Sequence, residues 1–207
     1  MPVIKTTDLI AKTVPEIPFQ GEGDSASVWG RSLGNLEADK LTSMKISHIP
    51  LTSSFSVFMI MRKVAEPIAP IINEPILSSE GIWSLSWIGD VTNPNLSFDF
   101  HREYLDEEDE DFEYLYPATL SEKLTLDEWY LVELSSNPSK IKLKASNLKI
   151  GNEISFEVEG IPGKLLNSSI LDINWNGVEI AELLIYNNNI DSTEVTSYLT
   201  KKYKALN

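Results

Sequence analysis

The sequence predicts an all-β protein that ends in one short α-helix. Ten or more short runs rich in branched and aromatic residues are separated by clusters of Gly, Pro, Asn, Asp and Ser, which is the pattern of a β-sandwich. Several of these runs alternate apolar and polar residues, as half-buried strands do. Near the C-terminus the apolar spacing changes to that of a helix.

Length and composition predict one folded domain with an N-terminal extension. The chain has 207 residues, and 42% of them are hydrophobic, so a core of sandwich size can form. Residues 1–27 contain three prolines and two glycines, and we expect them to form an extended arm with at most one short strand. We expect residues 28–207 to form the sandwich domain.

The first half of the domain shows both kinds of strand. The run "FSVFMIMRKV" (55–64) is apolar on both faces, which favours a central strand that is covered on both sides. The next segment, "AEPIAPIINEP" (65–75), carries three prolines and is predicted to be a loop. In "GIWSLSWIGD", Trp83, Leu85 and Trp87 share one face, and two serines share the other.

The second half of the domain continues the strand pattern. In "NLSFDFHRE" (95–103) one face is apolar, and the other carries Ser97, Asp99, His101 and Glu103. Further strand-like runs follow, namely "EWYLVELSS", "KIKLKASNLKIG", "NEISFEVEG", "SILDINWNG" and "VEIAELLIY".

The last segment, "DSTEVTSYLTKKY" (191–203), predicts the helix. Asp191 and Glu194 have the spacing of an N-cap acceptor and its reciprocal partner. An apolar stripe at helical spacing and a basic last turn follow; the stripe is Val195, Tyr198, Leu199 and Tyr203, and the basic residues are Lys201, Lys202 and Lys204. We expect this helix to lie on the sandwich as a clasp over an edge or an open end.

The C-terminal strand, turn and helix carry a family resemblance. The stretch "IAELLIYNNNI" followed by "DSTEVTSYLTKKY" resembles the C-terminal signature of the concanavalin A-like lectin/glucanase superfamily, in its laminin-G-like branch. The runs "FSVFMIMRKV", "WYLVELS" and "KIKLKASNLKIG" resemble upstream strands of that branch, so the resemblance covers residues 28–204. It implies a two-sheet antiparallel jelly roll with one concave face. Members include sugar-binding modules, enzymes and structural domains, so the fold alone does not assign a function.

Charge limits the classes of partner. The chain has 31 acidic and 17 basic residues, a formal net charge of -14, so it would repel nucleic acid and anionic lipid. We therefore expect no nucleic acid partner and favour neutral glycans or cations. The N-terminus shows no apolar run of signal-peptide length, and no 18-residue apolar segment occurs. These features predict a protein made in the cytoplasm without a signal peptide and without membrane insertion.

An acidic run is the first candidate site. "EYLDEEDEDFE" (103–113) holds eight carboxylates and is predicted to be a solvated hairpin loop. The alternative is a Ca²⁺ site with Asp106, Asp109 and Asp111 as candidate ligands, because hard cations prefer oxygen ligands. The absence of Cys and the presence of only two His exclude thiolate and His-based zinc centres.

Two further sets of residues could bind a ligand. Asp99, His101 and Glu103 stand on one side of a strand, where they could grip sugar hydroxyls or act as an acid and base, unless they form only a solvated sheet face. Trp175 lies between Asn174 and Asn176 in "DINWNG", a setting for stacking on a sugar ring, although packing in the core is the alternative.

Three functions follow from these observations. The leading hypothesis is a non-enzymatic lectin-like module, specifically a phage tail, baseplate or capsid protein used for assembly or host-glycan adhesion. It could associate with itself or with other virion subunits through residues 1–27. The alternative is a carbohydrate-active enzyme, a glycoside hydrolase or polysaccharide lyase, that uses Asp99, His101 or a carboxylate of residues 103–113. The third is an architectural protein without a ligand.

Overall fold

A computed structural model describes residues 4–5, 26–27, 43–51, 54–63, 74–79, 83–89, 94–105, 111–159, 164–165, 168–174 and 178–204. Within these ranges the side chains of residues 4–5, 26–27, 43–51, 74, 101–105, 111–117, 164–165 and 168–170 are outside the description.

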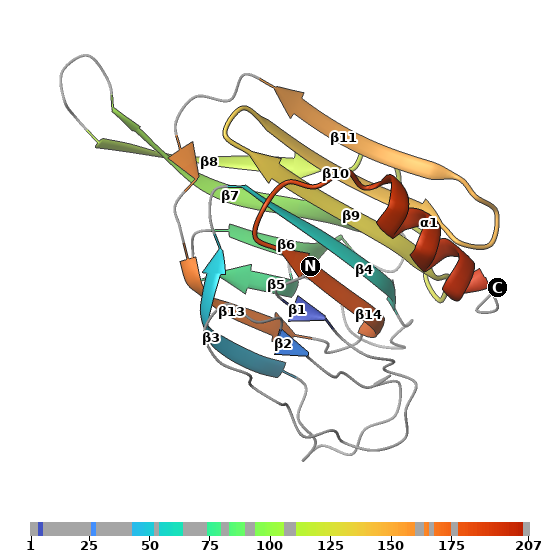
Figure 1. Ribbon diagram of the computed structural model, residues 1–207. Coiled ribbons are helices and arrows are strands. Elements are labelled where there is room, and N and C mark those ends of the chain that lie inside the picture. The colour runs from blue at the N-terminus through green and yellow to red at the C-terminus, as the bar shows by residue number, and fades with distance from the viewer. Residues whose placement is uncertain are drawn as a thin grey trace.

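The described residues form fourteen strands and one helix (Figure 1). The strands are β1 (Ile4–Lys5), β2 (Ala26–Ser27), β3 (Ser43–Leu51), β4 (Phe55–Lys63), β5 (Glu74–Ser79), β6 (Trp83–Ile88), β7 (Asn95–Leu105), β8 (Asp111–Thr119), β9 (Tyr130–Asn137), β10 (Lys140–Asn147), β11 (Glu153–Glu159), β12 (Lys164–Leu165), β13 (Ser168–Asn174) and β14 (Val178–Tyr186). The helix is α1 (Thr193–Lys202).

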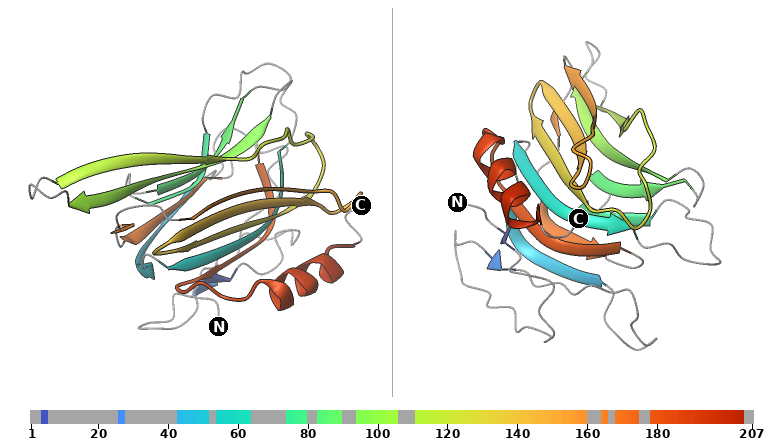
Figure 2. Two further views of the ribbon diagram at one scale, coloured as in Figure 1. Left: turned by 90° about the horizontal axis from the view of Figure 1, so that it is seen from above. Right: turned by 90° about the vertical axis from the view of Figure 1, so that its right-hand side faces the viewer.

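The strands build two packed sheets, which confirms the predicted sandwich. The front sheet in Figure 1 has the order β11-β10-β9-β4-β14-β1-β2, and the back sheet has the order β12-β7-β6-β5-β13-β3, with β8 paired to the other side of β7. Every pairing between the described strands is antiparallel except the short parallel pair of β1 and β2. Figure 2 shows that β7 and β8 extend beyond the other strands.

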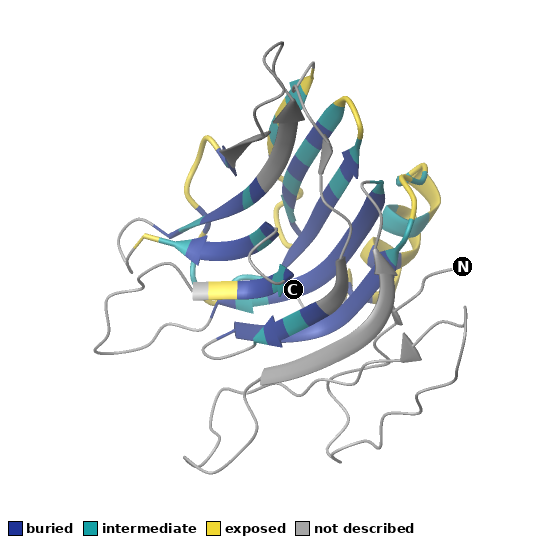
Figure 3. Ribbon diagram, turned by 90° about the vertical axis from the view of Figure 1, so that its left-hand side faces the viewer, coloured by how far each residue is buried: buried dark blue, intermediate teal, exposed yellow. Residues whose placement is uncertain are grey.

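One core fills the space between the sheets. In strands with described side chains, such as β6, β7, β9 and β10, alternate residues enter the core, so apolar rows from both sheets meet. Buried residues follow the described strands in Figure 3. Phe55 of β4 stacks on Trp83 of β6 with ring centroids 5.3 Å apart, and it contacts Phe98 of β7 edge-on. The prediction that Trp83, Leu85 and Trp87 belong to the core is confirmed.

Strand β4 is covered on both faces, as its sequence predicts. It lies between β9 and β14 in the front sheet. Four of its residues enter the core between the sheets, namely Phe55, Val57, Met59 and Met61. Phe58 and Ile60 enter a second cluster with Leu199 and Tyr203 of the C-terminal segment. A strand with two buried faces needs apolar residues at successive positions, which explains the unbroken run.

Helix α1 lies on the outer face of the front sheet, over β4 and β9 (Figure 2). The prediction that its apolar stripe packs on the sandwich is confirmed, but the expected position over an edge or open end is wrong. Leu199 and Tyr203 are buried and Val195 is partly buried, whereas Tyr198 is 48% exposed and does not belong to the buried stripe.

The start of the helix differs from the prediction by one residue. Ser192 is the N-cap and makes no side-chain capping bond. Asp191 instead accepts hydrogen bonds from the backbone N–H and the hydroxyl of Thr193, at 2.9 and 2.7 Å. The Asp191 carboxylate therefore orders the turn that precedes the helix, and these bonds lower its pKa.

Two loop predictions are refined by the strands. The loop predicted over residues 65–75 ends earlier, because Glu74 and Pro75 begin β5. Pro75 pairs with Ser86 on one side at the start of the strand, where a missing N–H is tolerated. The acidic run forms a hairpin in which Leu105 pairs with Asp111; residues 106–110 between them lie outside the described residues.

The N-terminal arm contributes two short strands rather than the single strand expected at most. Ile4 of β1 pairs with Ile185 of β14, and Ala26 of β2 pairs with Ile4. The rest of residues 1–27 lies outside the described part. Within that described part, we find no helix with the length and apolarity needed to cross a bilayer.

Candidate functional site

The outer face of the back sheet is polar because of the alternation in its strands. In β7, Leu96, Phe98 and Phe100 are buried in the core, which turns Ser97 and Asp99 outward. In β6 the three core residues are two tryptophans and a leucine, and Ser84 and Ser86 take the other face. Small hydroxyl side chains and one carboxylate therefore lie side by side on this surface.

Strand register aligns polar residues from four strands. Asp99 of β7 is paired with Ser84 of β6, Ser84 with Ser78 of β5, and Ser78 with Asp172 of β13. Three strand spacings of roughly 4.8 Å separate Asp99 from Asp172, about 14 Å in all. All four side chains are neither fully buried nor fully exposed, so this row is partly sheltered from solvent.

The "polar face" is the name used below for this row together with its polar neighbours on the same side of the sheet. Its members are Ser78, Ser84, Ser86, Ser97, Asp99, Thr119, Asp172 and Asn174. Asn174 belongs to it because Leu171 and Ile173 of β13 are buried, so Asp172 and Asn174 occupy the opposite face.

Hydrogen bonds fix the orientation of the acidic group. The hydroxyl of Ser97 lies 3.1 Å from Oδ1 of Asp99 and donates to it, and it also lies 2.9 Å from Oγ1 of Thr119. Ser86 donates to Ser84 at 3.3 Å. Because Ser97 and Ser86 are buried, they form a polar floor from which Asp99 and Ser84 project. Carboxylate and hydroxyl oxygens in this arrangement can accept from and donate to a polyhydroxyl ligand.

The structure unites two of the predicted site residues. Asp99 and Asn174, 75 positions apart, share the polar face. His101 and Glu103 lie in β7, in register with Leu115 and Glu113, but their side chains are outside the description. Trp175 and Asn176 also lie outside the described residues.

The predicted calcium ligands are not tested. Asp106 and Asp109 lie outside the described residues, and Asp111 begins β8 with an undescribed side chain. Among the described residues, no group of three or more His, Asp or Glu side chains could hold a metal ion.

Sequence reasoning did not include Ser78, Ser84, Thr119 and Asp172 in a site. The alternation in "GIWSLSWIGD" indicated a polar side for β6, but a single strand cannot show which strands lie beside it. The pairing of β5 with both β6 and β13 makes the row, and that pairing depends on long-range register.

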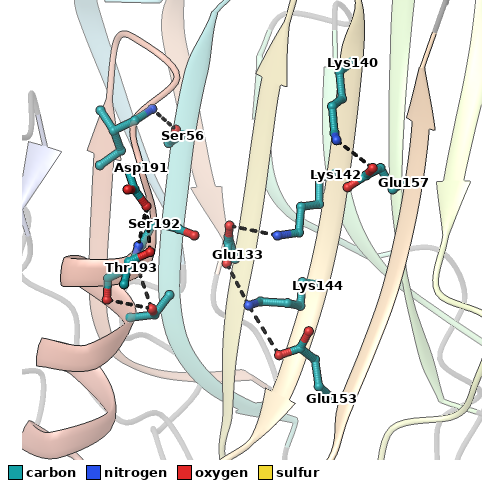
Figure 4. A network of polar contacts seen from close by, with 12 residues as sticks. Ser56, Glu133, Lys140, Lys142, Lys144, Glu153, Glu157, Asp191, Ser192 and Thr193 are labelled. Carbon is teal, nitrogen blue, oxygen red and sulfur yellow. Dashed lines mark hydrogen bonds and ion pairs between the residues drawn. The ribbon is translucent and has the colours of Figure 1, made fainter.

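A second polar region lies on the outer face of the front sheet, beside α1 (Figure 4). It is the "charge ladder" on β9, β10 and β11, formed by Glu133, Lys140, Lys142, Lys144, Glu153, Glu157 and Glu159. Buried Glu133 contacts the Nζ atoms of Lys142 and Lys144 at 3.6 and 3.2 Å. Burial alone would lower the pKa of Lys144, but the adjacent Glu133 and Glu153 carboxylates raise it.

The charge ladder holds charges of both signs and stabilises the sheet. Lys140 contacts Glu157 at 2.6 Å and Glu159 at 3.1 Å, and hydrogen bonds to these carboxylates raise its pKa. These pairs link β10 to β11 across the strands. The polar face is built mainly from hydroxyl, carboxylate and amide groups, and Lys45 of β3 adjoins it in register with Asp172. Its hydroxyl and amide groups make it the better candidate for binding a polar ligand.

Comparison with known proteins supports the fold and nothing finer. No family model matches the chain, and no curated protein matches it. Among solved structures, the full-length tailspike protein 2 from Escherichia coli O157:H7 bacteriophage CAB120 is similar over 80% of this chain, at 12% identity and a TM-score of 0.50.

The likeness concerns the fold, a two-sheet β-sandwich. Two other similar structures are a heptameric SAP-like pentraxin from Limulus polyphemus and the binding domain of botulinum neurotoxin serotype G. The pentraxin is 11% identical over 80% of this chain and 78% of its own, with a TM-score of 0.48. The toxin domain is 11% identical over 77% of this chain, with a TM-score of 0.45. The chain spans 42% of the toxin domain and 23% of the tailspike.

Proposed function

We propose that the chain is a non-enzymatic, lectin-like module that binds glycans on the polar face. The observation that carries this proposal is the register row of Asp99, Ser84, Ser78 and Asp172, which draws polar side chains from four strands onto one partly sheltered surface. Convergent polar groups held by a rigid sheet are what a specific ligand site requires.

Charge favours a neutral ligand with many hydroxyl groups. The net charge of -14 disfavours phosphate-rich ligands. The polar face offers hydroxyls, carboxylates and an amide, which are complementary to sugar hydroxyls as both donors and acceptors. The Ser97 bond fixes the orientation of Asp99 before a ligand arrives, and such preorganisation lowers the entropic cost of binding.

The spacing of the two carboxylates favours binding over hydrolysis. Asp99 and Asp172 are separated by about 14 Å across the sheet. Glycoside hydrolases need their two carboxyl groups roughly 5 Å apart for retention, or roughly 6.5–9.5 Å apart for inversion. These two residues therefore cannot act as a catalytic pair. The alternative, an enzyme that uses Asp99 with His101, predicts reducing-end release from a polysaccharide and loss of that release in His101→Ala.

We place this module in a phage virion, as a tail, baseplate or capsid component of the laminin-G-like branch. The similarity in fold to a bacteriophage tailspike over 80% of this chain supports that setting. The observed C-terminal strand, turn and helix support the laminin-G-like part of the proposal. The arm of residues 1–27 would join the module to another copy or another virion subunit. Removing residues 1–27 and measuring particle size by light scattering tests this, because loss of a defined oligomer is expected.

A glycan array with matched variants tests the binding proposal. The intact chain is expected to bind a subset of glycans, and Asp99→Asn and Asp172→Asn are each expected to weaken binding about tenfold or more, because each removes a charged acceptor. Glu194→Gln is the control, because Glu194 is exposed on α1 on the opposite side of the sandwich. Binding that both aspartate variants retain would contradict a site on the polar face. An absence of binding across broad panels would leave the architectural role.

A further inference from the structure

β11 is the outermost strand of the front sheet and pairs with β10 alone among the described strands (Figure 1). Seven consecutive pairs join them, from Lys140 with Glu159 to Ser146 with Glu153. No other described strand pairs with the second edge of β11, so within the described residues its outward backbone N–H and C=O groups are open along seven residues. Such an edge is a template for a further strand.

The two faces of β11 differ in chemistry. Glu153, Glu157 and Glu159 project outward with side-chain exposures of 54, 45 and 70%. On the inner face Phe156 and Val158 pack against the core but stay only partly buried. A strand added at this edge would therefore meet an acidic row on one side and an incompletely covered apolar row on the other.

A second copy of β11 does not fit this edge. Consider two copies of β11 paired in antiparallel, with their outward faces on the same side of the joined sheet. In that arrangement each odd-numbered residue of one copy lies opposite an odd-numbered residue of the other. Every such register with at least three outward pairs then sets carboxylates against each other, for example Glu153 against Glu159 of the other copy. Like charges directly opposite each other destabilise a pair of strands. The acidic row therefore excludes self-pairing and selects for a partner of opposite charge.

The existing neighbour of β11 shows which sequence does fit. β10 reads KIKLKASN, with Lys140, Lys142 and Lys144 on the acidic side and Ile141 and Leu143 in the core. The charge ladder contains four glutamates and three lysines. Two of these lysines also contact the buried Glu133 of β9, so the positive charge of β10 is shared between β9 and β11. Carboxylates have several acceptor sites each, so those of β11 can accept further cations from the open side.

We propose that the open edge of β11 is a docking site for an extended segment of a partner protein, in which Lys or Arg alternates with apolar residues. The segment adds a strand to the front sheet. Its basic side chains pair with Glu153, Glu157 and Glu159, and its apolar side chains extend the core over Phe156 and Val158. Backbone hydrogen bonds provide affinity, and the alternation of charge provides selectivity.

Peptide titration tests this with the intact chain. The probe is a blocked, fluorescent peptide with the β10 sequence KIKLKASN, measured by anisotropy. Three comparison peptides are needed: one with Glu in place of each Lys, one with the same composition in scrambled order, and one with N-methyl groups on alternate backbone nitrogens. The β10 peptide is expected to bind at least about fivefold more tightly than each of the other three, because only it combines charge, alternation and backbone donors.

Protein variants test the acidic row directly. The double variant Glu157→Gln/Glu159→Gln is expected to bind the β10 peptide about fivefold more weakly. The double variant Glu157→Lys/Glu159→Lys is expected to bind the Glu-substituted peptide more tightly than the β10 peptide. Glu194→Gln is the matched control and is expected to bind as the unmodified chain does. No binding of the β10 peptide to the unmodified chain, or equal binding of the scrambled or N-methylated peptide, would overturn the proposal.

Discussion

Lys202 in the last turn of α1 forms an ion pair with Glu182 of β14, with Nζ 2.9 Å from Oε2. Glu182 is fully buried, and its Oε1 has no hydrogen-bond partner within the described structure. Burial alone would lower the pKa of Lys202, but the hydrogen bond to Glu182 and the charge of that carboxylate raise it. The end of the helix is thereby tied to the middle of the front sheet by a pair that neither element could bury alone.

Removing the lysine should destabilise the protein. Lys202→Met leaves Glu182 charged, buried and unpaired, which we expect to cost about 2–4 kcal/mol of the free energy of unfolding. The lower part of that range allows for the partial exposure of Lys202. Urea denaturation measures the change. The double variant Lys202→Met/Glu182→Gln should lose less than the single variant, and an equal or greater loss would contradict the role of the pair.

Alkaline pH should weaken the attachment of the helix. Burial raises the pKa of Tyr203, and the net effect on Lys202 is also an increase, so at high pH the folded chain keeps protons that the unfolded chain has released. The free energy of unfolding should therefore stay level up to about pH 10 and fall above it, through the raised pKa values. Urea denaturation at a series of pH values measures this. Lys202→Met should show a shallower fall, and an unchanged profile would contradict this assignment.

Leu199 should be the main apolar anchor of α1. It is fully buried in the cluster with Phe58, Ile60 and Leu131, so Leu199→Ala removes contacts and leaves a cavity. We expect a loss of about 2–4 kcal/mol of unfolding free energy, measured by urea denaturation. Thr200→Ala, at the exposed neighbouring position, should change it by less than about 0.5 kcal/mol. Similar effects of the two variants would argue against packing as the cause.

The turn between β14 and α1 should depend on one buried hydroxyl. Ser56 of β4 donates to the carbonyl of Asn188 at 3.2 Å and accepts from the N–H of Ile190 at 3.1 Å. Ser56→Ala leaves both backbone groups without this partner, at a cost of about 1–3 kcal/mol. Amide hydrogen exchange should show faster exchange at Ile190. Ser197→Ala, on the exposed side of α1, is the control, and unchanged protection of Ile190 in Ser56→Ala would contradict the prediction.

Ser97, which lies beneath the polar face, should influence ligand affinity because its hydroxyl orients Asp99. Ser97→Ala removes the donor to Asp99 and the contact with Thr119, so the carboxylate loses its fixed orientation. We expect glycan affinity to fall about threefold to tenfold, measured by titration with a glycan selected from the array. Ser97→Thr, which keeps the hydroxyl, should restore part of it. Equal affinity in the Ala variant would show that orientation of Asp99 does not matter.

Strands β6 and β4 show why the local pattern of apolar and polar residues was sufficient to predict which strand faces are buried. Trp83, Leu85 and Trp87 alternate with serines, and alternation requires a strand with one buried face whatever lies beside it. The apolar run of β4 needs cover on both faces for the same reason. The error at Asp191 and Ser192 is also physical, because an Asp can accept from the N–H two residues onward in a turn as well as at a helix cap.

The sequence by itself determined the class of the fold, the faces of its main strands and the existence of the C-terminal helix, because periodicity, turn chemistry and propensity act over a few residues. Only the tertiary structure decided that α1 covers a sheet face, that Asp99 and Asp172 share a row, and that β11 forms an edge. These features depend on which distant strands pair and in which register. That choice is made by the packing of the whole core, which no local window of sequence contains.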